Sequence, residues 1–168
     1  MRRYLVLDGY NVVGALERYA TRSTGSLDAS RELVVGDALK AAGWTGQEII
    51  VVFDASRSPE PGRTELRGGG AVRVIYSAPN ESADDAIERL VRSWSGSFTV
   101  CTADFALQRT VLALGASRST PREFEALLDE LPALSRTPDV PFRPKVAERL
   151  PPKVIRSLEE LRRRATDR

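Results

Sequence analysis

Short apolar runs alternate with amphipathic segments along the first 130 residues of the chain. The apolar runs are bounded by turn-forming or polar residues and predict buried strands at 4–7, 48–53, 71–76 and 98–102. The segments between them place apolar residues at helical spacing. They predict helices at 27–44, from 82 to about 94, from about 104 to 114, and from 120 onward. This alternation is typical of an α/β domain with a mainly parallel sheet.

Two stretches lack this periodicity. Residues 55–70 contain prolines and the triplet Gly68-Gly69-Gly70, which predict a mobile loop. Prolines also recur from 132 to 152, where they predict a linker, and a last helix is predicted at 154–165.

The net charge of +2 conceals an asymmetry between the two ends of the chain. Residues 136–168 hold ten basic and five acidic side chains, so they carry +5 and leave −3 for residues 1–135. We expect an acidic α/β domain at 1–135, followed by a Pro-punctuated basic linker and C-terminal helix at 136–168. Such a division suits a carboxylate metal site beside a contact with a phosphate polymer.

Residue types that are missing exclude several kinds of chemistry. The 168 residues include no histidine and a single cysteine, Cys101. Ser-His-Asp and Cys-His catalysis and histidine-rich zinc or iron sites are therefore excluded. No apolar run approaches the ~20 residues of a transmembrane helix, the amino terminus turns polar too soon for a secretory signal, and one cysteine forms no internal disulfide. We expect a cytoplasmic protein that does not associate with membranes.

Aspartates follow the predicted strands in a recurring position. Asp8, Asp54 and Asp104 end or follow three strands, and Asp84-Asp85 opens the helix after another. Because the carboxyl ends of parallel strands share one edge, we expect these carboxylates to converge on one cleft. Carboxylates so close repel one another unless a cation neutralises them. Mg²⁺ or Mn²⁺ suits oxygen ligands and phosphates, and such an ion activates water and stabilises charge on a phosphodiester.

Each of these residues also has a structural interpretation. Asp104 suits the N-cap of the following helix, Asp85 completes a capping box, and Asp8 and Asp54 suit turns. Asn11 could hold an aspartate or a metal-bound water, or satisfy the backbone of a turn. Both interpretations stay open for each residue taken singly, and a shared site is favoured when all the acids are taken together.

Four stretches occur in a characteristic order. They are YLVLDGYNVVG at 4–14, VVFDA at 51–55, ESADDAIE at 81–88 and VCTAD at 100–104. These stretches resemble the motifs of NYN-domain proteins of the YacP type, which are PIN-like ribonucleases. The resemblance covers about residues 3–130 and, more weakly, the rest of the chain.

The resemblance implies a three-layer α/β/α PIN-like (NYN) domain and a metal-dependent endoribonuclease that cleaves mRNA in association with the ribosome. It implies that Asp8, Asp84 and Asp104 are catalytic acids that bind Mg²⁺ or Mn²⁺, with Asn11 assisting. Two further acids match family positions and would support the metal, namely Asp54 and Asp85.

Other functions are compatible with the same residues. A catalytically inactive RNA- or ribosome-binding module on this fold is the main alternative, and the basic residues 136–168 motivate it. A DNA nuclease or phosphatase would use the same carboxylates, but a HAD-type phosphatase needs Asp-x-Asp where this chain has Asp8-Gly9-Tyr10.

Seven arginines are candidates for contacts with RNA phosphates. Four flank the predicted loop and three lie in the last predicted helix: Arg57, Arg63, Arg67, Arg73, Arg162, Arg163 and Arg164. The loop arginines could equally be solvated surface residues. Tyr10, beside the predicted cleft, could stack on a base or belong to the core.

Overall fold

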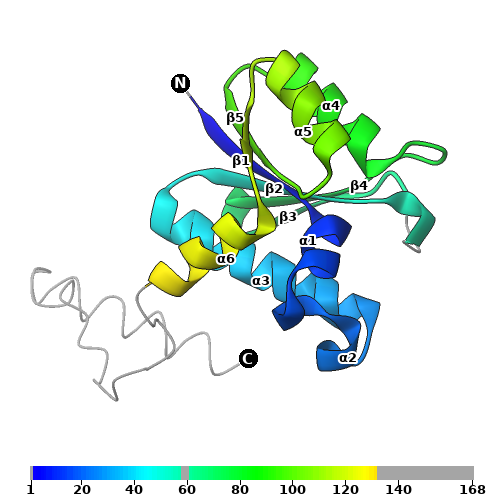
Figure 1. Ribbon diagram of the computed structural model, residues 1–168, viewed down its shortest axis with the longest axis vertical. Coiled ribbons are helices and arrows are strands. Elements are labelled where there is room, and N and C mark those ends of the chain that lie inside the picture. The colour runs from blue at the N-terminus through cyan, green and yellow to red at the C-terminus, as the bar shows by residue number, and fades with distance from the viewer. Residues whose placement is uncertain (1, 58–60, 132–168) are drawn as a thin grey trace, which may run out of the picture. The chain divides into compact units, whose positions relative to one another are not determined.

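The computed structural model describes residues 2–57 and 61–131, all of which belong to the unit Met1–Pro132 (Figure 1). The predicted linker and last helix therefore lie outside the described residues. The division of the chain at residue 135 stays a prediction.

A six-stranded sheet with the strand order β3-β4-β2-β1-β5-β6 forms the middle of this unit. Five strands are parallel to their neighbours, namely β1 (Arg3–Asp8), β2 (Glu48–Phe53), β4 (Val72–Tyr76), β5 (Ser97–Cys101) and β6 (Ser117–Ser119). At one edge, β3 (Thr64–Arg67) runs antiparallel to β4. The predicted mainly parallel sheet is confirmed.

Helices cover both faces of the sheet, which gives three layers (Figure 1). One face carries α1 (Gly9–Ala15), α2 (Thr21–Thr24), α3 (Leu27–Thr45) and α6 (Pro121–Glu130), and the other carries α4 (Ala83–Ser93) and α5 (Phe105–Ala113). Successive side chains of β1 point to opposite faces. Leu5 and Leu7 join the core on the α3 side, and Tyr4 and Val6 join the core on the α4 side. Because both faces are buried, the parallel strands are continuous apolar runs.

Helices α4 and α6 begin where the sequence predicts. Ser82 and Asp85 form a capping box at the start of α4, and Thr120 and Glu123 form one at the start of α6. Pro121 takes the first helical position of α6, where its missing N–H costs nothing.

The described residues of the range 55–70 differ from the predicted mobile loop. Within them lie 3₁₀ turns at Ala55–Arg57 and Gly68–Gly70 and the strand β3. The three glycines have φ of 57°, 66° and 95°, a left-handed run that turns the chain from β3 into β4. Strand β3 has a polar sequence with an exposed Leu66, and its pairing with β4 supplies the backbone hydrogen bonds. An edge strand of this kind shows no apolar run in the sequence.

Three short elements were not predicted, namely α1, α2 and β6, together with a 3₁₀ turn at Glu17–Tyr19. Helix α1 begins directly after Asp8, whose carboxylate caps it. A Cβ on Gly9 would lie 2.3 Å from the Phe53 ring, so glycine permits this helix to start against the end of β2. The Asp8-Gly9 pair, which suits a turn, is here a helix start.

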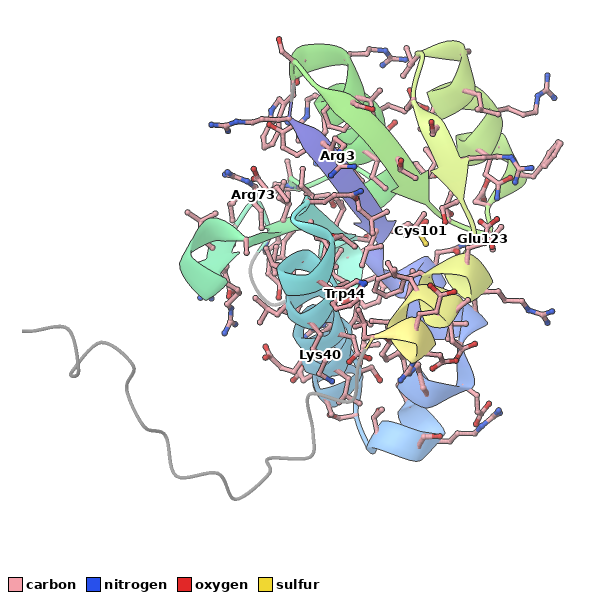
Figure 2. All side chains as sticks on the ribbon, turned by 90° about the vertical axis from the view of Figure 1, so that its left-hand side faces the viewer. Arg3, Lys40, Trp44, Arg73, Cys101 and Glu123 are labelled. Carbon is pink, nitrogen blue, oxygen red and sulfur yellow. The ribbon has the colours of Figure 1, made fainter. Side chains whose placement is uncertain are left out.

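The lone cysteine, Cys101, lies buried at the end of β5 (Figure 2). Burial raises the pKa of its thiol to about 12, so this side chain is a neutral part of the core. Within the described part of the chain, no helix combines the length and the apolar character that a membrane crossing requires.

Candidate metal and nucleic-acid site

The carboxyl ends of β1 and β5 lie side by side in the sheet. The helices that follow these two strands, α1 and α5, lie on opposite faces (Figure 1). In an open parallel sheet, the place between two such strand ends is the usual ligand site, and we call it the crevice. Asp8 ends β1 at this crevice, and Asp104 follows β5.

Asp8 is the most buried of the candidate acids, with 6% of its surface exposed. The Thr102 hydroxyl donates to Asp8 Oδ2 at 3.0 Å, and the backbone N–H of Asn11 approaches Oδ1 at 3.4 Å. Burial raises the pKa of Asp8 to about 6 against the lowering effect of these donors, and the charges of Asp84 and Asp104 add to the rise. Asp8 therefore lies in an environment that disfavours its charge.

Asp84 and Asp85 are adjacent in the chain and differ in surroundings. Asp84 is half-buried, and its pKa is raised first by burial and then by the charges of Asp104 and other acids. Asp85 is exposed and accepts hydrogen bonds from the backbone N–H and hydroxyl of Ser82, which lower its pKa. Asp84 thus belongs to the acidic group, whereas Asp85 holds the start of α4.

Asp104 combines a structural contact with a place beside the other acids. Its Oδ1 accepts hydrogen bonds from the backbone N–H groups of Ala106 at 2.7 Å and Leu107 at 3.0 Å, so it is the N-cap of α5. Its charge nevertheless raises the pKa of both Asp8 and Asp84. The structural and the functional interpretation of Asp104 are therefore compatible.

Asn11 positions the loop that carries Asp104. Its Oδ1 accepts a hydrogen bond from the backbone N–H of Ala103 at 2.7 Å and so ties α1 to the turn after β5. This contact gives Asn11 a role in arranging the acids on either side of the crevice.

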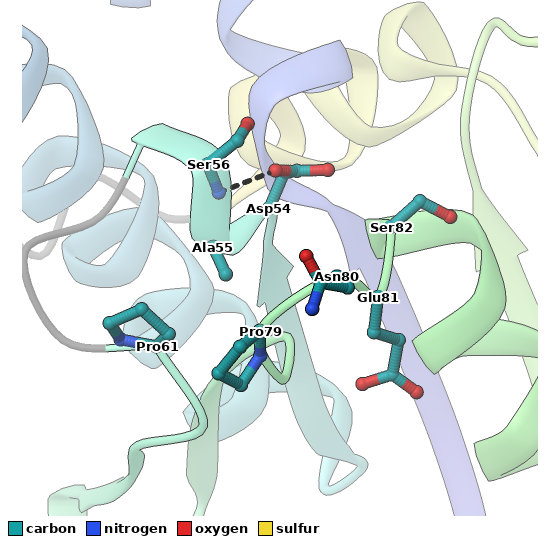
Figure 3. A pocket seen from close by; sticks show the side chains of 8 residues that line it. All are labelled: Asp54, Ala55, Ser56, Pro61, Pro79, Asn80, Glu81 and Ser82. Atoms are coloured by element: carbon teal, nitrogen blue, oxygen red, sulfur yellow. Dashed lines mark hydrogen bonds between the residues drawn. The ribbon is translucent and has the colours of Figure 1, made fainter.

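Seven residues line a hollow of about 340 Å³, which we call the acidic cleft: Asp8, Tyr10, Asp54, Ser56, Ser82, Ala83 and Asp84. A second hollow of about 460 Å³ shares Asp54, Ser56 and Ser82 with it and extends past Pro79 and Asn80 (Figure 3). Asp54 accepts a hydrogen bond from the backbone N–H of Ser56 at 2.7 Å, drawn as a dashed line in Figure 3. The structure therefore brings Asp8, Asp54 and Asp84 to one hollow.

The arrangement of the acids bears on how a metal ion would bind. Within residues 2–57 and 61–131, no three side chains of the metal-binding types are grouped closely enough to hold an ion between them. All candidate donors are carboxylate oxygens, and Mg²⁺ commonly binds through one or two carboxylates, several waters and substrate phosphates. The residues present fit that open kind of site rather than a closed cage.

Two predicted RNA contacts, Arg63 and Arg67, form ion pairs with Glu65 at 3.2 and 2.8 Å. These ion pairs lie on and beside β3, outside the lining of the acidic cleft. The side chain of Arg57 lies outside the described residues, as do Arg162, Arg163 and Arg164.

Arg73, on β4 (Figure 2), lies far from the acidic cleft. Its guanidinium is 3.3 Å from Glu48 and 5.1 Å from the centre of the Trp94 ring. Glu48 begins β2 and Asp54 follows its end, so at ~3.3 Å per residue the two are about 20 Å apart. The structure does not bring Arg73 to the acids.

Two further residues, Thr102 and Tyr10, take part in the site. The apolar run at 98–102 predicts only that Thr102 ends a strand, although a polar residue after an apolar run is a signal in itself. Tyr10 lines the acidic cleft while its ring packs 5.1 Å from that of Phe53 and its hydroxyl accepts a hydrogen bond from Arg31 at 2.8 Å. Tyr10 thus belongs both to the cleft and to the packing beneath it.

Comparisons with known proteins identify the family of this chain. A family model described as the YacP-like NYN domain matches residues 5–163. The Bacillus subtilis protein named "Uncharacterized protein YacP" is 31% identical over 163 residues, which is 94% of this chain and 92% of that protein.

Solved structures of a similar protein share the fold. A crystal structure of a mutant of Rae1 (YacP) from Bacillus subtilis superposes with a TM-score of 0.64 at 28% identity, covering 78% of this chain and 77% of that one. A second crystal structure of Rae1 (YacP) gives 0.61 at 27% identity, covering 76% and 74%. The NYN domain is a PIN-like nuclease fold, and the family supports a nuclease-like function related to RNA. The chain belongs to the YacP-like NYN domain family.

Proposed function

We propose that this protein is a divalent-metal-dependent endoribonuclease that cleaves RNA phosphodiester bonds, with mRNA in association with the ribosome as its substrate. The observation that carries the proposal is the gathering of Asp8, Asp84 and Asp104 at the central crevice of a nuclease fold. The charges of Asp84 and Asp104 help to raise the pKa of Asp8, the charge of Asp104 helps to raise the pKa of Asp84, and no cationic side chain of the described residues pairs with Asp8. Strongly perturbed acids in a cleft are typical of functional sites.

Asp8 and Asp84 are the residues that would hold Mg²⁺ or Mn²⁺, with Asp54 and Asp104 beside them. The ion, when bound, activates water and stabilises the charge that develops on the phosphodiester. Because the acids are arranged openly, the RNA phosphate itself would complete the coordination.

Thr102 and Asn11 hold the acids in place for this role. The backbone N–H of Asp104 donates to Thr102 Oγ1 at 3.0 Å, so the single hydroxyl proton of Thr102 is directed to Asp8. Asn11 fixes the same turn through Ala103. Since the chain has no histidine, proton transfers during cleavage depend on carboxylates and water.

The proposed association with ribosomes and mRNA depends on electrostatic attraction. Residues 1–135, which include the acids, carry a net charge of −3 that repels a polyanion, whereas residues 136–168 carry a net charge of +5. A basic segment of this kind attracts ribosomal RNA and mRNA through their phosphates.

The neighbouring acids Asp84 and Asp85 provide a matched test. Asp84→Asn and Asp85→Asn remove the same charge one residue apart, so general electrostatic effects are shared. With Mg²⁺ or Mn²⁺ and an unstructured RNA, we expect Asp84→Asn to lower the cleavage rate at least about 100-fold and Asp85→Asn to leave it within about twofold. EDTA should abolish cleavage by the unmodified protein, and a DNA strand of the same sequence should stay intact. Equal rates for both variants, or cleavage in EDTA, would contradict the proposal.

A non-catalytic RNA- or ribosome-binding module is the second candidate. It is favoured by the commitment of Asp85 and one oxygen of Asp104 to helix caps. Co-sedimentation with ribosomes that is unchanged in Asp84→Asn, together with no metal-dependent cleavage of mRNA on or off the ribosome, would support this candidate over the first.

A further inference from the structure

The outward face of α5 begins at the acids and carries an exposed aromatic side chain. Phe105 directly follows Asp104 and is 71% exposed, the highest value among the large apolar side chains described. Leu107, Gln108 and Val111 form the buried face of the same helix. Phe105 is therefore directed away from the core by helix geometry, and no packing within the described residues accounts for an aromatic residue at this position.

Arg109 lies one turn beyond Phe105 on the same face. Side chains four residues apart on a helix are neighbours, with Cβ atoms ~5–6 Å apart. Arg109 is exposed, and among the described residues it has no ion pair or hydrogen bond. It also lines a hollow with Ala106, Thr110 and Ala113, whose small side chains leave room beside the helix. The face thus pairs an aromatic ring with an unneutralised cation.

The cations near this face contrast with those on the other side of the sheet. On and beside β3 and β4, Arg63, Arg67 and Arg73 are neutralised by glutamates. On the α5 side, Arg118 of β6 donates to Gln108 Oε1 at 3.5 Å, and its charge contributes to lowering the pKa of the Glu123 carboxyl. Arg109, which has no ion pair within the described residues, therefore offers positive charge to an external anion on the side where α5 lies.

We propose that Phe105 and Arg109 form a platform for the RNA strand next to the phosphodiester held at the acids. One unpaired base stacks on the Phe105 ring, and Arg109 binds a phosphate one step along the strand. The unpaired charge of Arg109 and the continuity of this face with Asp104 favour a single-stranded nucleic acid over an apolar protein segment. Stacking on an aromatic ring reads no particular base, so the platform confers preference for unpaired RNA rather than for a sequence. This inference rests on the proposed function and assigns the path of its substrate.

Binding of a fluorescent, unstructured RNA to the full-length chain carrying Asp84→Asn tests the platform without cleavage. Phe105→Ala should raise the Kd about tenfold, since stacking contributes on this scale, and Phe105→Trp should restore it. The matched control is Leu66→Ala, which truncates another exposed apolar side chain at the opposite edge of the sheet. It should leave the Kd unchanged. A duplex of the same RNA should bind the Phe105→Ala variant and its parent equally.

Arg109→Ala should weaken binding and lower the salt dependence by about 0.7 in the slope of log K against log salt, as expected for one lost contact to a single strand. Arg22→Ala on α2 removes the same charge elsewhere and should leave that slope unchanged. A Kd that Phe105→Ala does not alter would overturn the platform while metal-dependent cleavage by the unmodified chain still upholds the proposed function. RNA that binds and is weakened by Phe105→Ala, but is never cleaved, would uphold the platform and overturn the nuclease. No RNA binding by the parent would overturn both.

Discussion

Asp8 and Asp37 are two aspartates buried to nearly the same degree, with 6% and 8% of their surface exposed. Asp37, on α3, accepts a hydrogen bond from the Tyr19 hydroxyl at 2.8 Å and forms ion pairs with Lys40 at 2.7 Å and Arg18 at 3.8 Å. Burial and the nearby Asp37 carboxylate raise the pKa of Tyr19, which stays a neutral donor. The charge of Asp37 is therefore compensated by its surroundings.

Asp8 has neutral donors and acidic neighbours instead. Thr102 and the Asn11 backbone supply its hydrogen bonds, and Asp84 and Asp104 add negative charge. A buried carboxylate is costly unless it is paired, so the chain compensates the charge at Asp37 and leaves it uncompensated at Asp8. The difference separates a carboxylate that serves the fold from one that awaits an external cation.

The largest expected contrast between the two aspartates is in cleavage of RNA. Asp8→Asn removes a proposed metal ligand and should lower the rate at least about 100-fold, since even residues behind metal ligands cost 10- to 100-fold. Asp37→Asn removes an equally buried charge from the α3 side and should leave the rate within about threefold. Single-turnover assays well below the melting temperature measure this. Similar losses in both variants would mean that burial, rather than a role in the site, explains the effect of Asp8.

How far the sequence predicts these differences depends on the range of the interactions. The sequence predicts strands β1 and β2 closely. Both faces of a parallel sheet are buried, so each of these strands is a continuous apolar run in the sequence. The same edge rule predicted that Asp8, Asp54 and Asp84 meet. In contrast, β3 and β6 are short, polar edge strands whose pairing partners decide their structure. Local sequence carries little signal for them.

Contacts between residues far apart in the sequence also explain why the roles of some site residues could not be predicted. The sequence identifies Asp85 as part of a capping box but leaves open whether it also supports a metal ion, and the three-dimensional arrangement places Asp84 among the acids and Asp85 at the start of α4. Arg73 was expected near RNA, but Glu48, 25 positions away, holds its guanidinium at the opposite end of the strands. Thr102 reaches Asp8 across 94 positions.

Substitution of the two aspartates by asparagine should change the free energy of unfolding in opposite directions. Asp37→Asn removes the counter-charge of Lys40 and leaves Arg18 with its ion pair to Asp129 alone. Because these cations are partly exposed, we expect a loss of about 1–2 kcal/mol in the free energy of unfolding. Asp8→Asn at pH 8 removes an unfavourable charge and should add about 1–2 kcal/mol. Urea denaturation of the two variants and their parent measures both. A loss of stability in Asp8→Asn would show that its charge is compensated after all.

The pH dependence of stability should also report the uncompensated charge of Asp8. The pKa of Asp8 is about 6 in the folded protein against a model value of 3.8, so between these values the folded state binds more protons than the unfolded state. Stability from this group therefore rises as the pH falls from 8 to 5, by about 1.4 kcal/mol. The raised pKa of Asp84 acts in the same direction. Urea midpoints across this range should show the rise in the parent and in Asp37→Asn, and a smaller rise in Asp8→Asn. An unchanged rise in Asp8→Asn would assign it to other groups.

The smallest expected effect is stabilisation by the metal ion itself. An ion that binds only the folded state at three times its Kd adds about 0.8 kcal/mol, which for a chain of this size raises the melting temperature by about 2–3 °C. Because Asp8 must be charged to take part, the shift with Mg²⁺ or Mn²⁺ should be clear at pH 8, smaller at pH 5 and reversed by EDTA. Asp37→Asn should keep the shift and Asp8→Asn should lose it. Equal shifts in the two variants would place the ion away from Asp8, and the uncompensated charge there would then need another explanation.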